Sequence, residues 1–149
     1  MPLDFSEIIL SIEQRERKHL LSFNEADVSR RPSPDKWSKK EILGHLIDSA
    51  SNNHQRFVRA QFLDKLEFPG YQQREWVQAQ NYAEESWAQL VELWSAYNQH
   101  LAHVVAQIQP KKFSTICKVG DNDVMTLEAL IADYIRHMEH HLKQLSDTR

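Results

Sequence analysis

Apolar residues recur at three- and four-residue steps along most of this chain, and that helical period constrains its fold more than any other feature. The clearest run covers residues 87–108, where aromatic and aliphatic side chains follow one another a helical turn apart. Only three glycines and five prolines occur among 149 residues, so breaks are rare. No stretch alternates apolar and polar residues as a half-buried strand would. The pattern therefore predicts an all-α protein.

Local signals divide the chain into four long helices joined by polar connections. The clearest start is at Ser38, which forms an S-x-x-E capping box with Glu41. Thr126 is a cap for the last helix, and Glu84 and Glu85 suit the first turn of the third. The expected helices are 4–23 with Asp4 or Ser6 as cap, 38–63, one long helix within 72–108 preceded by a possible short one, and 127–145. Residues 24–35 and 111–125 are expected to be loops, and the whole chain, 1–149, to be one four-helix-bundle domain.

Bulk composition excludes several classes of function. The net charge of −3 gives no attraction to nucleic acid or to an anionic membrane surface. No run approaches the roughly 20 apolar residues that a membrane span needs, and the N-terminal segment lacks a signal-peptide pattern. Cys117 is the only cysteine, so no intrachain disulfide can form. These features favour a cytoplasmic location, with Cys117 as a small loop residue rather than a nucleophile.

Three histidines on two of the expected helices are the candidate functional site. His137 and His141 are four residues apart, so both project from one side of the last helix, and His45 lies early in the second. If the two helices pack together, three imidazoles meet, and three protein ligands with one open position are typical of a catalytic metal centre. The pattern also fits hydrogen-bonded boundary histidines, because eight histidines in the chain make such a pair common by chance. No glutamate stands where an H-E-x-x-H motif needs it.

Angular positions along the two helices refine this interpretation. At about 100° per residue, Asn52 and Arg56 fall within roughly 20° of His45, and the apolar face of that helix is centred about 120° away. On the last helix His141 falls inside the apolar stripe, His137 lies at its edge and His140 points away. The pair that leans inward is therefore His137 and His141.

The segments WSKKEILGHLIDSASNNHQRF and DYIRHMEHHLKQL resemble the two signature regions of the DinB-like (YfiT-type) helical-bundle superfamily, and the similarity extends over nearly the whole chain. The resemblance implies a four-helix bundle that holds a divalent metal ion through His45, His137 and His141. It also implies metal-dependent chemistry on a small-molecule substrate. Family members include metal-dependent hydrolases and thiol S-transferases that use a low-molecular-weight thiol: bacillithiol, mycothiol or glutathione.

Imidazole ligands suit Zn²⁺, Ni²⁺, Fe²⁺ and Co²⁺, and the sequence does not choose among them. Such an ion could activate either a water or a thiol. Asp48, one turn beyond His45, is the candidate catalytic residue, as an acid, a base or a group that orients a ligand; a contact with solvent or Arg56 is the equal alternative. Asn52 and Arg56 could meet a polar substrate group, although Arg56 fits a structural ion pair equally well. Gln144 could hydrogen-bond within the cleft.

The sequence leaves two other functions open besides that of a metal-dependent transferase or hydrolase. One is a non-catalytic metal-binding or ligand-sensing bundle, and the other is a purely structural protein. The four tryptophans at residues 37, 76, 87 and 94 are expected mainly in the core, with a pocket lining as the alternative. A homodimer is expected because bundles with aromatic-rich faces often pair.

Overall fold

The computed structural model describes residues 4–147. Its elements in chain order are α1 (Phe5–Leu21), α2 (Glu25–Ser29), α3 (Lys39–Arg59), β1 (Lys65–Phe68), α4 (Gln73–Gln80), the 3₁₀ turn η1 (Tyr82–Glu84), α5 (Trp87–Ala106), the 3₁₀ turn η2 (Pro110–Ser114), β2 (Ile116–Val119), β3 (Met125–Thr126) and α6 (Leu127–Asp147).

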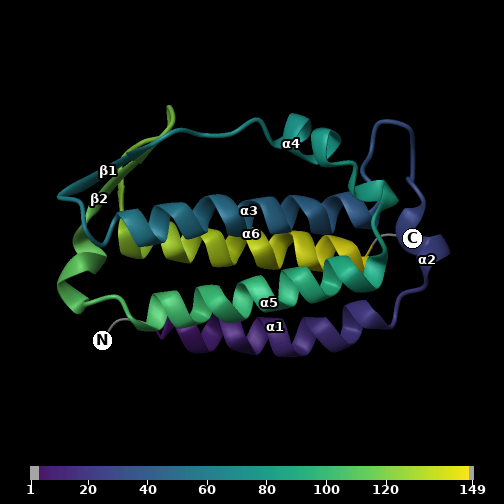
Figure 1. The fold of residues 1–149 in the computed structure, drawn as a ribbon, viewed down its shortest axis with the longest axis horizontal. Coiled ribbons are helices and arrows are strands. Elements are labelled where there is room, and N and C mark those ends of the chain that lie inside the picture. Colours follow the sequence, from purple (N-terminus) through teal and green to yellow (C-terminus); the bar gives the residue numbers. More distant parts are fainter. Residues whose placement is uncertain (1–3, 148–149) are drawn as a thin grey trace.

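The four long helices α1, α3, α5 and α6 form the bundle (Figure 1). Helix α1 packs on α5, α5 on α3, α3 on α6, and α6 closes the ring on α1. Side chains from all four helices fill one core, in which Phe57, Trp94 and Met138 are among the largest that are almost fully buried. The predicted all-α bundle is confirmed, and so is a short helix before the third long one.

Helix starts follow the local signals closely. The Ser38 hydroxyl accepts from the backbone N–H of Glu41 at 3.2 Å, and the Glu41 carboxylate accepts from the Ser38 N–H at 2.9 Å. Asp4 caps α1 by accepting from the N–H of Glu7, and Thr126 caps α6 by accepting from the N–H of Ala129. Each cap satisfies an N–H group that has no partner inside its own helix. These predicted caps are confirmed.

The expectation of no strands is wrong. Strands β1 and β2 pair in parallel, with Leu66 opposite Cys117, and β3 pairs antiparallel with β2. Within residues 4–147 the strands have four residues or fewer, and about fifty residues of chain separate β1 from β2, so no local alternation of apolar and polar residues indicates them. Cys117 therefore lies in a strand, fully buried, rather than in a loop.

Three helix boundaries also differ from expectation. The connection 24–35 contains α2, which Asn24 caps by accepting from the N–H of Asp27. Helix α3 ends at Arg59 instead of residue 63. Glu84 and Glu85 precede α5, because the Ser86 hydroxyl caps that helix. Short polar side chains, Asn24 and Ser86, start α2 and α5, whereas the C-cap of α3 is Ala60, whose backbone N–H donates to the carbonyls of Arg56 and Val58.

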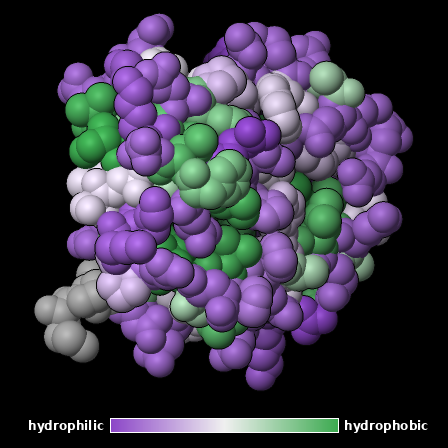
Figure 2. Space-filling view, turned by 60° about the vertical axis from the view of Figure 1, so that its left-hand side comes forward, coloured by the Kyte–Doolittle hydropathy of each residue, from purple (hydrophilic) through white to green (hydrophobic). Residues whose placement is uncertain are grey.

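The surface at the sheet end of the molecule is mixed. Figure 2 shows apolar surface there in separate patches that hydrophilic residues divide. Exposed apolar side chains at nearby elements include Phe62, just beyond α3, and Ile116 in β2. Among residues 4–147, none of the helices combines the length and hydrophobicity that crossing a membrane requires.

Candidate metal centre

The histidine cluster lies where α3 and α6 run side by side in opposite directions (Figure 1). The beginning of α3 therefore meets the end of α6. The ring centroids are 5.0 Å apart for His45 and His137, 4.9 Å for His45 and His141, and 4.6 Å for His137 and His141. One nitrogen from each ring lies within 4.8 Å of the others. The structure thus brings together the three residues that the sequence singled out.

The spacing of the ring nitrogens fits a shared metal ion. Nε2 of His45 and Nε2 of His137 are 3.1 Å apart. Two imidazoles on one tetrahedral zinc ion, at bond lengths of about 2.0–2.1 Å, would place their nitrogens about 3.3 Å apart. The third nitrogen can close the remaining distance by side-chain rotation, because the second torsion of histidine is soft.

Burial argues against the alternative of hydrogen-bonded boundary histidines. The His45 side chain is only 1% exposed, and its Nδ1 has no hydrogen-bond partner in the described part of the chain. A buried polar atom normally has such a partner. His45 is thus deeply buried with only its Nε2 in polar contact, through His137, which is unlike a boundary histidine that both ring nitrogens anchor by hydrogen bonds.

The burial of His45 also corrects an expectation from the helical wheel. The helical wheel predicts His45 about 120° from the apolar face of its helix, yet α3 is buried almost all round between residues 40 and 50. Helix α4 and turn η1 pack on the side of α3 that the bundle leaves uncovered. The polar side of α3 is therefore an inner wall of the protein rather than a solvated face.

All three imidazoles favour the neutral form. Burial, together with the neighbouring rings of His137 and His141, lowers the pKa of His45 to about 4. Burial and the neighbouring His141 ring likewise lower the pKa of His137 to about 4, and burial lowers the pKa of His141. Neutral imidazole is the form that binds a metal ion. The cluster is therefore in its ligand form at neutral pH.

Gln144 fixes the orientation of His141. Nδ1 of His141 lies 2.9 Å from Oε1 of Gln144, one helical turn further along α6. Because Oε1 can only accept, Nδ1 carries the proton and Nε2 keeps its lone pair. A partner of this kind is common behind metal-binding histidines, where it sets the tautomer and the ring orientation.

Asp48 is buried, at 2% exposure, one turn beyond His45. Its Oδ1 accepts from the Tyr82 hydroxyl at 2.7 Å and from Nε2 of Gln80 at 2.8 Å, while its Oδ2 is buried with no partner among the described residues. Burial raises the pKa of Asp48, and those two hydrogen bonds only partly offset the effect. The carboxylate of Asp48 therefore contacts Tyr82 and Gln80 instead of solvent or Arg56. Its catalytic role stays a prediction.

A pocket of about 560 Å³ opens beside the cluster, lined by residues of α3, of α6 and of the segment that links β1 to α4. Figure 1 shows that segment passing over α3. His137 and His140 line it from α6, Ser49, Asn53 and Arg56 from α3, and Tyr71 from the overlying segment. Asn52 is directed to its own helix instead, donating to the backbone oxygen of Asp48. Sequence reasoning missed Ser49, Asn53 and Tyr71; the recurrence of polar residues at turn spacing after His45 is the signal that could have found the first two.

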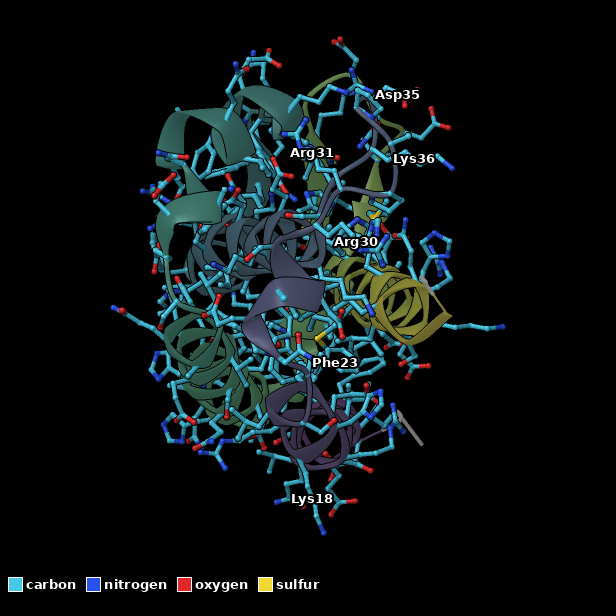
Figure 3. The ribbon with its side chains drawn as sticks, turned by 90° about the vertical axis from the view of Figure 1, so that its right-hand side faces the viewer. Lys18, Phe23, Arg30, Arg31, Asp35 and Lys36 are labelled. Carbon is cyan, nitrogen blue, oxygen red and sulfur yellow. The ribbon has the colours of Figure 1, made fainter. Side chains whose placement is uncertain are left out.

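A second, larger pocket of about 1020 Å³ reaches the cluster from the end of the bundle. His141, Gln144 and Trp37 line it, together with Arg31, Asp35 and Lys36 of the segment between α2 and α3. Figure 3 shows these last three side chains on that segment, beside the end of α6. The Trp37 ring lies 5.3 Å from that of His45. The cluster is therefore reached from two sides.

The remaining aromatic residues divide between core and surface. Trp87 and Trp94 are core residues, Trp37 lines a pocket, and Trp76 is 37% exposed, so the expectation of core tryptophans is confirmed for two of the four. His54, His100 and His103 form a separate row of rings, with centroids 5.2 Å and 6.3 Å apart. Nδ1 of His54 contacts the Tyr97 hydroxyl.

Comparisons with known proteins agree with this arrangement. A protein of Halalkalibacterium halodurans named "Putative metal-dependent hydrolase" is 20% identical over 137 residues, which cover 92% of this chain and 80% of that protein. The solved structure of YfiT from Bacillus subtilis superposes with a TM-score of 0.84 at 14% identity, covering 96% of this chain and 82% of YfiT. YfiT is described as a probable metal-dependent hydrolase with an unusual four-helix bundle topology. At that identity the likeness establishes the fold.

The family model of the DinB superfamily matches residues 11–145, a range that contains His45, His137 and His141. With nearly the whole chain matched, this protein belongs to the DinB superfamily.

Proposed function

We propose that this protein is a divalent-metal-dependent enzyme that acts on a small molecule, with His45, His137 and His141 as the metal ligands. The observation that carries the proposal is the convergence of three neutral imidazoles, one buried and two half-buried, beside an open pocket, with Nε2 of His45 and Nε2 of His137 3.1 Å apart. The donor set suits Zn²⁺, Ni²⁺ or Fe²⁺. When bound, such an ion supplies a Lewis acid that lowers the pKa of a water or thiol in its open position.

The chain's own residues would prepare and shield that chemistry. Gln144 holds the His141 tautomer that leaves Nε2 free. The buried ring of His45 keeps solvent from one side of the cluster, and the pocket beside His137 admits a substrate from the other. We include Asp48 as a positioning residue, since its carboxylate fixes Tyr82 and Gln80 against α3.

Hydrolysis is the reaction that we favour, because two similar proteins carry hydrolase names. Thiol S-transfer uses the same open position with a low-molecular-weight thiol in place of water, so one experiment should compare both. The cytoplasmic location and the homodimer stay predictions, and the non-catalytic metal-binding or ligand-sensing bundle is the competing outcome.

The first experiment measures the metal content of purified, untagged protein by plasma mass spectrometry. The variant His45→Ala/His137→Ala/His141→Ala should lose a near-stoichiometric divalent ion. The matched control is His54→Ala/His100→Ala/His103→Ala, which removes the other row of rings and should keep the ion. Loss in both variants, or no ion in wild type even after addition of Zn²⁺, Ni²⁺ and Fe²⁺, would refute the metal site.

The second experiment assays the metal-loaded and metal-stripped proteins on esters, amides and lactones, and on electrophiles with an added thiol. Activity that follows metal loading on the first panel supports a hydrolase, and on the second a transferase. A fully loaded protein that is inactive on both panels would support the binding or sensing function instead.

A further inference from the structure

Arg56 carries a buried positive charge that no ion pair neutralises within the described part of the chain. Its side chain is only 8% exposed, and its Nε has no hydrogen-bond partner in the part of the chain that the structure describes. Nη1 of Arg56 donates to Oδ1 of Asn53, but that hydrogen bond is long, at 3.4 Å. Within residues 4–146, none of the ion pairs involves Arg56. A buried guanidinium is ordinarily paired with an anion, so this one lacks its partner.

Arg56 faces the same pocket as His137. Along α3 the pocket wall continues from Ser49 through Asn53 to Arg56, at steps of four and three residues, and all three are buried polar side chains. Arg56 follows His45 by three helical turns, or about 16 Å of helix axis, on nearly the same side of α3. A cation therefore stands at one end of the pocket and the histidine cluster at the other.

The other charges of the pocket leave room for one negative charge. Arg136 lines the same pocket, but it is exposed and already paired with Asp133. That pair contributes no net charge, which leaves the single charge of Arg56. Tyr71 adds a neutral hydroxyl, since burial and the nearby charge of Asp48 raise its pKa to about 12. At the Arg56 end of the pocket, away from any ion held by the histidine cluster, a monoanion matches this single positive charge, whereas a dianionic phosphate would exceed it.

We propose that Arg56 forms a subsite for a carboxylate group of the substrate, which holds that group while the opposite end of the molecule lies at the histidine cluster. The inference rests on the proposed function, because it takes the cluster as the reacting centre. It narrows the substrate to small molecules that carry a carboxylate remote from the bond that reacts. Asn53 positions the guanidinium from the next turn of α3. The planar group can bind both oxygens of a carboxylate.

The test uses protein loaded with Co²⁺ and a series of ω-mercapto carboxylates, from 3-mercaptopropanoate to 8-mercaptooctanoate. Each is compared with the ω-mercapto alcohol of the same length, and binding is followed by the thiolate-to-cobalt absorption band. At one preferred chain length the carboxylate should bind about tenfold tighter than the alcohol, the gain expected of a charged hydrogen bond. Arg56→Gln should reduce that ratio to near one while leaving the affinity for the alcohol unchanged.

Arg59→Gln is the matched control. Arg59 is on the same helix and its guanidinium carbon is also 5.7 Å from the Phe68 ring, but it is exposed and does not line the pocket. The ratio should survive in this variant. If Arg56→Gln does not fold, Arg56→Lys, which keeps the charge but loses the planar fork, should give an intermediate ratio. A ratio near one at every length in wild type, or an unchanged ratio in the Arg56 variants, would overturn the subsite.

A metal-free measurement separates this inference from the proposed function. In ¹⁵N-labelled, metal-stripped wild type, hexanoate should shift the Nε–H resonance of Arg56, and hexanol should not. If cobalt fails to bind, the proposed function fails, yet this measurement still decides the subsite. An Arg56 resonance that ignores hexanoate would overturn the subsite even in a protein that binds cobalt.

Discussion

Gly44, the residue before His45, is the position where one added methyl group has the most predictable effect. A Cβ built on Gly44 would lie 2.2 Å from Cδ2 of Tyr82, and 2.5 Å from both Cε2 and Cγ of that ring. The Tyr82 ring is 2% exposed, and its hydroxyl donates to Asp48 at 2.7 Å. In Gly44→Ala the ring must therefore leave its place on α3.

Two opposing effects set the magnitude. Replacing glycine by alanine inside an exposed helix stabilises it by about 1 kcal/mol. Against this, overpacking a core costs about 1–3 kcal/mol. Losing the hydroxyl that satisfies the buried Asp48 carboxylate costs a further 1–3 kcal/mol or so. The net expectation is a destabilisation of about 3 kcal/mol, which corresponds to a fall in Tm of roughly 10 °C for a chain of this length.

Differential scanning calorimetry of the metal-free proteins measures this effect without any contribution from metal binding. Gly70→Ala is the control, because nothing lies within 4 Å of a Cβ at that exposed position, and its Tm should change by no more than a degree or two. A Tm for Gly44→Ala equal to or above wild type would refute the close approach of Tyr82 to α3.

A double-mutant cycle with Tyr82→Ala tests the cause as well as the size. If the clash is with the ring, Gly44→Ala should cost several kcal/mol in wild type and almost nothing in the Tyr82→Ala background. Equal costs in both backgrounds would place the strain elsewhere on α3.

Three further outcomes are expected. Gln144→Ala should weaken metal binding about 10-fold or more without unfolding the protein, because His141 loses the acceptor that sets its tautomer. Competition with a chromophoric chelator measures the metal affinity, and an affinity equal to wild type would show that this contact does not orient His141. Burial, and then the charge of His100, lowers the pKa of His54 in the folded protein. The unfolded chain therefore binds that proton more readily, and stability is lost as the pH falls below the ordinary histidine pKa. The fall in Tm between pH 7 and pH 5 should be smaller in His54→Gln than in wild type, and an equal fall would contradict the lowered pKa of His54. Cys117 is buried, and burial raises the pKa of its thiol, so it should react with Ellman's reagent no faster than local unfolding exposes it. Reaction at the rate of a free thiol would show that the Cys117 side chain is accessible in the folded protein.

The candidate site was predictable to the extent that it depends on helical spacing. His137 and His141 project from one side of α6 because they are four residues apart. The packing of α3 against α6 is the one further condition that brings His45 to them. Gln144 was predicted to make a hydrogen bond in the cleft, and it contacts His141. Asp48 was placed near His45 correctly, but its partners, Tyr82 and Gln80, are more than thirty residues away in sequence and could not be anticipated.

By itself the sequence determined where helices begin and which residues share a helical face. A capping box such as Ser38 with Glu41 acts within one turn, so four letters suffice to locate it. Only the tertiary structure decided that the polar side of α3 is buried, that β1 pairs with β2, and that Arg56 ends in a pocket where residues 4–146 offer it no ion-pair partner. Each of these depends on α4, η1 or the sheet folding back over the bundle from a distant part of the chain. Contacts of that kind have no local period, so nothing in a single stretch of sequence records them.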